Sequence, residues 1–202
     1  MTSGKTTFHT IMDTTERLIQ EKGCRQTTLQ DIIRETGLSK GAIYHYVSSK
    51  DELLGLILKS RVERINERFT EIVNNPQMSG LGDPLELIAE GMVRSSSHQN
   101  VTNLIFIYLL GQMDNPKVME IVQEVYGYTM QTCTKWIDIG KQHGVIPAEI
   151  ESGKTAELFA MILYGLRVSS TIIQKPSPFT TKDLAAFMRR SLVSDSCDRV
   201  VQ

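Results

Sequence analysis

The stretch from residue 39 to residue 50 holds the side chains best suited to binding nucleic acid. It begins with three small residues and one cation, Ser39, Lys40, Gly41 and Ala42. Small side chains let a helix approach the edges of bases closely, and a lysine can reach guanine acceptors or a phosphate. We therefore expect these four residues to address base edges in a groove of DNA.

Polar rings and a second cation follow in the same stretch. Tyr44, His45 and Tyr46 are consecutive, and consecutive positions of a helix point in different directions, so the three rings cannot all be buried. Tyrosine hydroxyls and histidine N–H groups commonly donate to phosphates. Lys50 lies where another helix is predicted to begin, and free N–H groups there favour an anion. We expect these four residues to bind DNA phosphates; a helical hairpin with an aromatic core is the alternative.

Two short helices are predicted to position these side chains. Thr28 and Asp31 have the spacing of a capping box that begins a helix. Gly37 follows that helix as a left-handed C-terminal residue, a conformation that costs glycine little. Ser39 is an N-cap candidate for the second helix, over residues 39–46. A helix, a tight turn and a second helix form a helix-turn-helix (HTH) motif, whose second helix lies in the major groove.

The stretch TTLQDIIRETGLSKGAIYHYVSSKDELL resembles the DNA-binding signature of TetR-type (TetR/AcrR) bacterial transcriptional regulators. The shared features are the paired threonines, the Gly-Leu-Ser turn, the Lys-Gly-x-x-Tyr helix and the Ser-Lys-x-Glu-Leu-Leu restart, over about the first quarter of the chain. We expect Thr27 and Thr28 to contact DNA phosphates as well. The stretch departs from the family at Val47, where an aromatic residue is more usual, and we expect Val47 to pack inward.

The whole chain has the composition of an ordinary globular protein. It has 202 residues and a formal net charge of −1, with 41% hydrophobic and 22% charged residues. Residues 1–50 hold 7 Lys/Arg and 5 Asp/Glu, whereas residues 51–202 hold 15 and 18, so the positive excess lies with the HTH motif. Three widely spaced cysteines, Cys24, Cys133 and Cys197, argue against a disulfide framework. We expect a cytoplasmic protein with no secretory signal and no membrane span.

Apolar residues at helical spacing recur along the whole chain and predict an all-α fold. A first helix over residues 6–22 covers the HTH motif, and a long helix over residues 50–74 leads away from it. Five more helices are predicted over residues 83–97, 101–113, 116–143, 152–174 and 180–192, with loops at 74–82 and 175–178 and a polar tail after 194. The predicted domains are a three-helix DNA-binding head, residues 1–50 (HTH motif about 28–47), and a helical effector-binding and dimerisation domain, residues 51–202.

The resemblance implies a homodimer and an effector pocket. In the family, the last two long helices form a four-helix bundle with a partner chain; here these are residues 152–174 and 180–192. Thioethers and amphipathic rings suit an adaptable apolar pocket, although such residues at helical spacing are more often plain core. The candidates are Met92, Phe106, Tyr108, Leu109, Met113, Tyr126, Met130, Trp136, Phe159 and Met161.

No arrangement of residues predicts catalysis or metal binding. His9, His45, His98 and His143 are scattered without metal-ligand spacing, and there is no Gly-rich phosphate loop and no Gly-x-Ser-x-Gly motif. We therefore expect no enzymatic activity, no metal and no cofactor.

The residues and the resemblance together predict a ligand-responsive DNA-binding transcriptional regulator. A repressor is the commonest type in the family, released from a pseudo-palindromic operator in double-stranded DNA by a small, largely apolar effector. Two alternatives stay open. One is a helical ligand-binding or scaffold protein whose HTH motif no longer binds DNA, and the other is an activator of the same fold.

Overall fold

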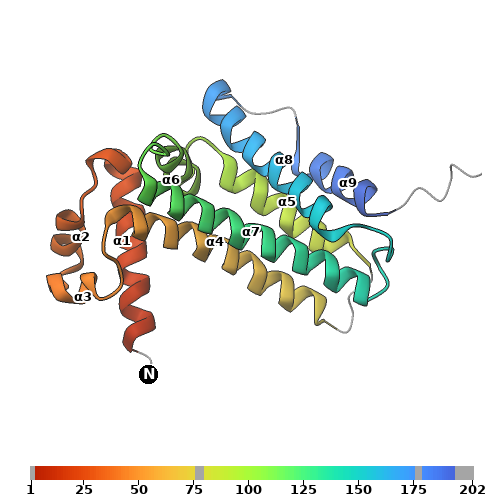
Figure 1. Ribbon diagram of the computed structural model, residues 1–202, viewed down its shortest axis with the longest axis horizontal. Coiled ribbons are helices and arrows are strands. Elements are labelled where there is room, and N and C mark those ends of the chain that lie inside the picture. The colour runs from red at the N-terminus through yellow and green to blue at the C-terminus, as the bar shows by residue number, and fades with distance from the viewer. Residues whose placement is uncertain (1–2, 76–79, 176–178, 194–202) are drawn as a thin grey trace, which may run out of the picture. The chain divides into compact units, whose positions relative to one another are not determined.

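The computed structural model describes residues 3–75, 80–175 and 179–193. These residues form nine helices and no strand, which confirms the predicted all-α class (Figure 1). The helices are α1 (Ser3–Gln26), α2 (Leu29–Thr36), α3 (Lys40–Tyr44), α4 (Lys50–Val73), α5 (Gly82–Ser96), α6 (Val101–Leu110), α7 (Pro116–Gln142), α8 (Ser152–Ile173) and α9 (Thr181–Leu192). Cys197, the polar tail and parts of the two predicted loops lie outside the described residues.

The helices form two compact units. The first unit comprises Met1–Arg61 and Gln99–Val125, and the second comprises Val62–His98 and Tyr126–Gln202. Helices α4 and α7 each contribute residues to both units. The first unit therefore contains α6 in addition to the predicted head, and a domain boundary at residue 50 stays a prediction.

Buried residues from five helices form the core of the first unit. Ile11, Ile32, Ile43, Leu53 and Ile105 come from five different helices, and all are fully buried. Helix α1 packs against both α2 and α6. Helices as short as α2 and α3 are not stable alone in water, so burial of side chains such as Ile32 and Ile43, each worth roughly 1.5–3 kcal/mol, holds them in place.

The second unit has its own core around α5, α8 and α9. Helix α5 packs against both α8 and α9. The rings of Phe69 and Trp136 lie 5.2 Å apart, and the Trp136 indole N–H donates to Asn66 at 2.9 Å. Leu184 and Met188 of α9 are fully buried in the same cluster. A buried tryptophan needs a partner for its N–H, and Asn66 meets that need.

Two helix ends of the first unit differ from the sequence prediction. Gly23 directly follows the first predicted helix, residues 6–22; with φ 80° and ψ 164° it is not helical and kinks α1, and helical residues resume beyond it up to Gln26. Helix α3 ends at Tyr44 and not at Tyr46. The amides of Tyr46 and Val47 both donate to the Ile43 carbonyl, which closes a turn at the end of the helix.

Two ends of later helices also differ. Helix α5 begins at Gly82, one residue before the predicted range 83–97, and Asp83 lies in its first turn, where a carboxylate interacts favourably with the free N–H groups. Helix α6 was expected to reach Met113 and ends before it. Gly111 takes the C-cap position and its N–H donates to the Ile107 carbonyl, so the chain turns there.

Other predicted helix starts are confirmed. The Asn115 side chain accepts the N–H of Lys117 at 3.0 Å at the beginning of α7. Thr180 and Asp183 form a complete capping box at the beginning of α9. These starts depend on contacts within three residues, which is why the sequence pattern predicts them.

Candidate nucleic-acid interface

The first helix of the HTH motif is held at its start by a hydrogen-bonded cluster. The Thr28 hydroxyl accepts the N–H of Asp31 at 3.1 Å, and the Asp31 carboxylate accepts the N–H of Thr28 at 3.0 Å, which confirms the predicted capping box. Lys22 and Arg34 each donate to Asp31 at 2.8 Å. These donors, with Lys22 the largest cause, hold the pKa of Asp31 well below its usual range. Asp31 therefore joins α1 to the start of α2.

The turn and the second helix have the predicted local structure. Gly37 has φ 68°, a left-handed conformation, and its N–H donates to the Ile33 carbonyl. The Ser39 hydroxyl accepts the N–H of Ala42 at 3.1 Å as the N-cap of α3. Ile43 is fully buried and anchors α3 to the core of the first unit.

The outward side of α3 carries small side chains and one cation. Ser39, Lys40 and Gly41 are exposed, and Ala42 is half-buried. A Cβ added at Gly41 would meet no atom within 4 Å. This surface can therefore approach another molecule closely, which readout of base edges in the major groove requires.

The three consecutive rings divide between solvent and core, as predicted. Tyr44 is 46% exposed, and the Lys40 ammonium lies 5.5 Å from the centre of its ring. His45 is exposed, whereas Tyr46 is half-buried, with its ring centre 5.3 Å from that of Phe8. Tyr44 and His45 therefore stand beside the small residues of α3 on an accessible surface.

Thr27 and Lys50 have partners inside the first unit. Thr27 is fully buried and its hydroxyl donates to the Gly23 carbonyl at 2.9 Å. The Lys50 ammonium donates to the Cys24 carbonyl at 2.7 Å and lies 4.7 Å from the centre of the Tyr108 ring. Their assignment to DNA phosphates stays a prediction, and the observed contacts do not support it.

Two serines form hydrogen bonds with Glu52 at the start of α4. The Ser49 hydroxyl accepts the N–H of Glu52 at 3.1 Å. The Glu52 carboxylate, however, accepts both the N–H and the hydroxyl of Ser48, at 2.7 and 2.6 Å. The Ser48 hydroxyl is the main cause of a lowered pKa at Glu52. Val47, beside this start, is 2% exposed, which confirms that it packs inward.

The ten effector candidates divide between the two units. In the first unit, Phe106 and Leu109 are buried and Tyr108 and Met113 are half-buried. In the second unit, Met92, Trp136 and Phe159 are buried, Met130 is half-buried, and Tyr126 and Met161 are exposed. Their role in effector binding stays a prediction.

A polar cluster in the second unit adds Tyr164 and Arg167 to the candidate Tyr126. The Tyr126 and Tyr164 rings stack at 5.9 Å. Arg167, one turn after Tyr164 on α8, is 7% exposed, and its guanidinium lies 6.0 Å from the Tyr164 ring centre. Burial lowers the pKa of Arg167 to about 10. An arginine between Leu166 and Val168 in an apolar helix was the available sequence signal.

The N-terminal region matches a known protein family. Residues 11–57 match the family model described as bacterial regulatory proteins, tetR family, and this range contains the HTH motif described above. This N-terminal region is therefore similar to the TetR family of bacterial regulators. The resemblance found in the sequence is thereby confirmed.

Relatives of this chain include named regulators. The HTH-type transcriptional regulator PksA of Bacillus subtilis is 39% identical over 62 residues, which cover 31% of this chain and 30% of PksA. The HTH-type transcriptional repressor KstR2 of Rhodococcus jostii is 34% identical over 73 residues, which cover 36% of each protein. These matches span about a third of the relatives' length. The relatives are regulators, which supports the prediction that the chain is not an enzyme.

Solved structures are similar in fold over most of the chain. The transcriptional regulator FadR of Bacillus subtilis, solved in complex with stearoyl-CoA, superposes with a TM-score of 0.61. The two chains are 20% identical, and the match covers 92% of this chain and 95% of FadR. The likeness therefore includes the helices beyond the HTH motif and concerns their fold.

Proposed function

We propose that this TetR-family chain is a ligand-responsive transcriptional regulator that binds an operator in double-stranded DNA as a homodimer. The observation that carries the proposal is the presentation of α3. Ile43 anchors the helix in the core, while Lys40, Gly41 and Tyr44 face solvent. The N-terminal match to the family supports the same assignment.

Helix α3 would lie in the major groove. Ser39, Lys40, Gly41 and Ala42 would address base edges, because their small side chains permit close approach. Thr28, Tyr44 and His45, which are exposed, would fix the register through phosphates. Tyr46 would add to these contacts from its half-buried position.

A second copy of the chain would cover the apolar outer surface of α8. Over 18 residues of α8 the mean hydropathy is 1.4, and only 22% of this stretch is buried. By length and composition alone, α8 is apolar enough to span a membrane. Its exposed apolar residues are Leu158, Met161, Val168, Ile172 and Ile173. We assign this surface to a bundle of α8 and α9 with a partner chain. Two-fold symmetry would then place two α3 helices on half-sites roughly 34–36 Å apart or a multiple of that distance.

A small, largely apolar effector would bind among helices of the second unit. Tyr126, Tyr164 and Arg167 offer rings and one buried cation close to apolar core residues. FadR, which shares the fold, was solved with a ligand that has a long apolar chain. Helices α4 and α7 contribute residues to both units. An effector that favours one conformation of the second unit would therefore shift the equilibrium of the dimer between DNA-binding and non-binding states. Most family members of this type are repressors, and we propose the same here.

The test begins with selection of bound duplexes from a random DNA pool. The double variant Lys40→Ala with Tyr44→Ala should lose at least about tenfold in affinity for the selected operator. Lys40 would lose a charged contact to the bases, and Tyr44 would lose a hydrogen bond to a phosphate. Its melting temperature should stay that of the parent, because both side chains are exposed. Lys135→Ala, an exposed lysine of the second unit, is the matched control.

The outcomes separate the proposal from its alternatives. Failure to select any duplex, with the fold intact, favours a helical ligand-binding or scaffold protein. An equal loss of stability and of DNA affinity in the double variant would place Lys40 and Tyr44 in the folding core and contradict the interface proposed here.

A further inference from the structure

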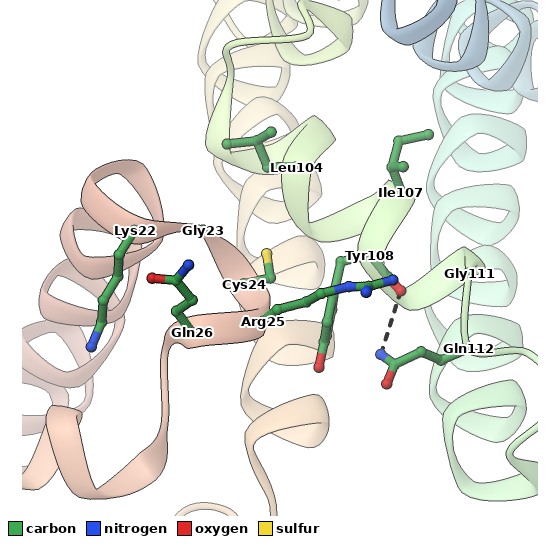
Figure 2. A pocket seen from close by; sticks show the side chains of 10 residues that line it. All are labelled: Lys22, Gly23, Cys24, Arg25, Gln26, Leu104, Ile107, Tyr108, Gly111 and Gln112. Atoms are coloured by element: carbon green, nitrogen blue, oxygen red, sulfur yellow. Dashed lines mark hydrogen bonds between the residues drawn. The ribbon is translucent and has the colours of Figure 1, made fainter.

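A crevice in the first unit lies between the end of α1 and one side of α6. Its volume is about 610 Å³, within the range of about 300–1,000 Å³ found for small-molecule sites. Residues 22–26 line one side of the crevice, and Leu104, Ile107, Tyr108 and Gln112 line the other (Figure 2). All these residues belong to the same compact unit.

Two glycines shape the crevice. Gly23 kinks α1, with φ 80° and ψ 164°, so the last residues of α1 depart from the axis of the preceding turns. The α6 residues that line the crevice follow a spacing of three and four, which places them on one side of a helix. Gly111 continues that row without a side chain, and a Cβ there would meet only carbonyl oxygens at 3.5 and 3.6 Å.

The charged rim of the crevice carries Lys22 and Arg25. Lys22 is bound to Asp31 at 2.8 Å. Arg25 is exposed and forms no ion pair within residues 3–75, 80–175 and 179–193. Figure 2 shows its side chain pointing from α1 toward Gln112, in the turn after α6. A guanidinium offers a planar fork of donors that matches a carboxylate.

The floor of the crevice, formed by Cys24, Leu104 and Ile107, is apolar, and the Lys50 ammonium lies close to Cys24. Leu104 and Ile107 are half-buried, and Cys24 is buried. Burial raises the pKa of the Cys24 thiol to about 11, although Lys50 acts to lower it and Asp51 acts to raise it more weakly. A low-dielectric floor strengthens charge interactions at the rim.

We propose that this crevice binds a small carboxylate with a short apolar body. The carboxylate lies on the Arg25 guanidinium, with the side-chain amides of Gln26 and Gln112 as further donors. The apolar body lies on Leu104 and Ile107. Because the apolar floor adjoins the cation, an amphipathic anion fits the crevice better than a bare inorganic ion.

The position of the crevice gives the bound ligand a defined consequence. Residues 25 and 26 directly precede Thr27 and Thr28, which lead into α2. A ligand that contacts both Arg25 and α6 ties the start of the HTH motif to α6. The site is separate from the effector site proposed for the second unit, and its occupancy does not depend on DNA binding.

The test follows binding of octanoate to the full-length chain by amide NMR shifts. Octanoate should shift the amide resonances of residues 22–26 and 104–112 in a saturable manner. Octanamide, which has the same length and no charge, should bind about tenfold more weakly, the loss expected for one charge-assisted hydrogen-bonded contact. Inorganic phosphate should not produce the same saturable shifts.

Two variants locate the binding groups. Arg25→Gln should bring octanoate affinity down to that of octanamide and leave octanamide affinity unchanged, whereas Arg68→Gln, an exposed arginine of the second unit, should change neither. Gly111→Leu should weaken both ligands, because a side chain there enters the crevice without a backbone clash.

Four results would overturn the proposal. They are octanoate shifts confined to the second unit, equal affinities for octanoate and octanamide, phosphate shifts that match those of octanoate, and Arg25→Gln binding octanoate like the parent. Loss of operator binding leaves these readouts intact, so failure of the proposed function and failure of this site are distinguished.

Discussion

The Lys50 ammonium donates a hydrogen bond to the Cys24 carbonyl oxygen at 2.7 Å, across 26 positions of the chain. The same ammonium lies 4.7 Å from the centre of the Tyr108 ring. The first residue of α4 thereby joins the kinked end of α1 to α6 within the first unit. A carbonyl near the end of α1 is an acceptor that the helix itself leaves open, and Lys50 occupies it.

Replacing Lys50 by Met should destabilise the protein. The variant keeps most of the apolar stem and loses both the hydrogen bond and the cation–π contact, so we expect a loss of roughly 1–3 kcal/mol in the free energy of unfolding. Chemical denaturation measures this loss, with Lys117→Met, an exposed lysine at the start of α7, as the control. Unchanged stability together with weakened operator binding would instead assign Lys50 to a DNA phosphate.

Gly41→Leu should separate DNA binding from folding. A Cβ added at Gly41 meets no atom within 4 Å, and leucine favours a helix over glycine by up to about 1 kcal/mol, so stability should hold or rise. Operator affinity should fall at least about tenfold, because the side chain blocks close approach to base edges. Gly127→Leu, at an exposed glycine of α7 with the same open surroundings, should leave operator affinity unchanged. Retained affinity in Gly41→Leu would contradict the placement of α3 in the groove.

Asp31 should make stability depend on pH in the acid range. Its folded-state pKa lies below the ordinary value of 3.8, mainly because Lys22 donates to it. The stabilisation is therefore complete above the ordinary value and is lost as the pH falls through the folded-state pKa. Asp31→Asn should lower the melting temperature at pH 7, and the difference from the parent should shrink below about pH 4.

The control for that measurement is Asp114→Asn, an exposed residue of the turn before α7. Its melting temperature should match that of the parent at every pH. If Asp31→Asn has the same melting temperature as the parent at pH 7, the cluster of Thr28, Lys22 and Arg34 around Asp31 does not stabilise the start of α2.

A charge on the outer surface of α8 should separate the proposed dimer. Ile172 is 74% exposed, so Ile172→Asp should leave the fold of one copy intact while placing a charge in a buried apolar contact between copies, which is costly. Sedimentation should show a shift from dimer to monomer. Glu157→Gln, an exposed change on α8 that adds no charge, is the control, and a dimer that persists in Ile172→Asp would move the interface elsewhere.

Local contacts made much of this protein predictable from its residues. The helix starts at Thr28, Ser39 and Thr180 and the left-handed turn at Gly37 each involve groups within four positions of one another. Hydrophobic periodicity likewise indicated the helices and the inward direction of Val47. These features depend on backbone geometry over one or two turns, which the order of residues specifies directly.

Tertiary structure alone decided where the longer polar side chains lie. Lys50 reaches Cys24 and Tyr108, Thr27 is buried, and Arg167 is enclosed beside Tyr164, although an exposed position is the usual one for such residues. The crevice beside Arg25 likewise exists only because the kinked end of α1 packs near α6. The groups around Lys50 and the two sides of the crevice lie far apart in the chain, and the burial of Thr27 and Arg167 depends on how the helices pack, so no pattern of neighbouring residues specifies them.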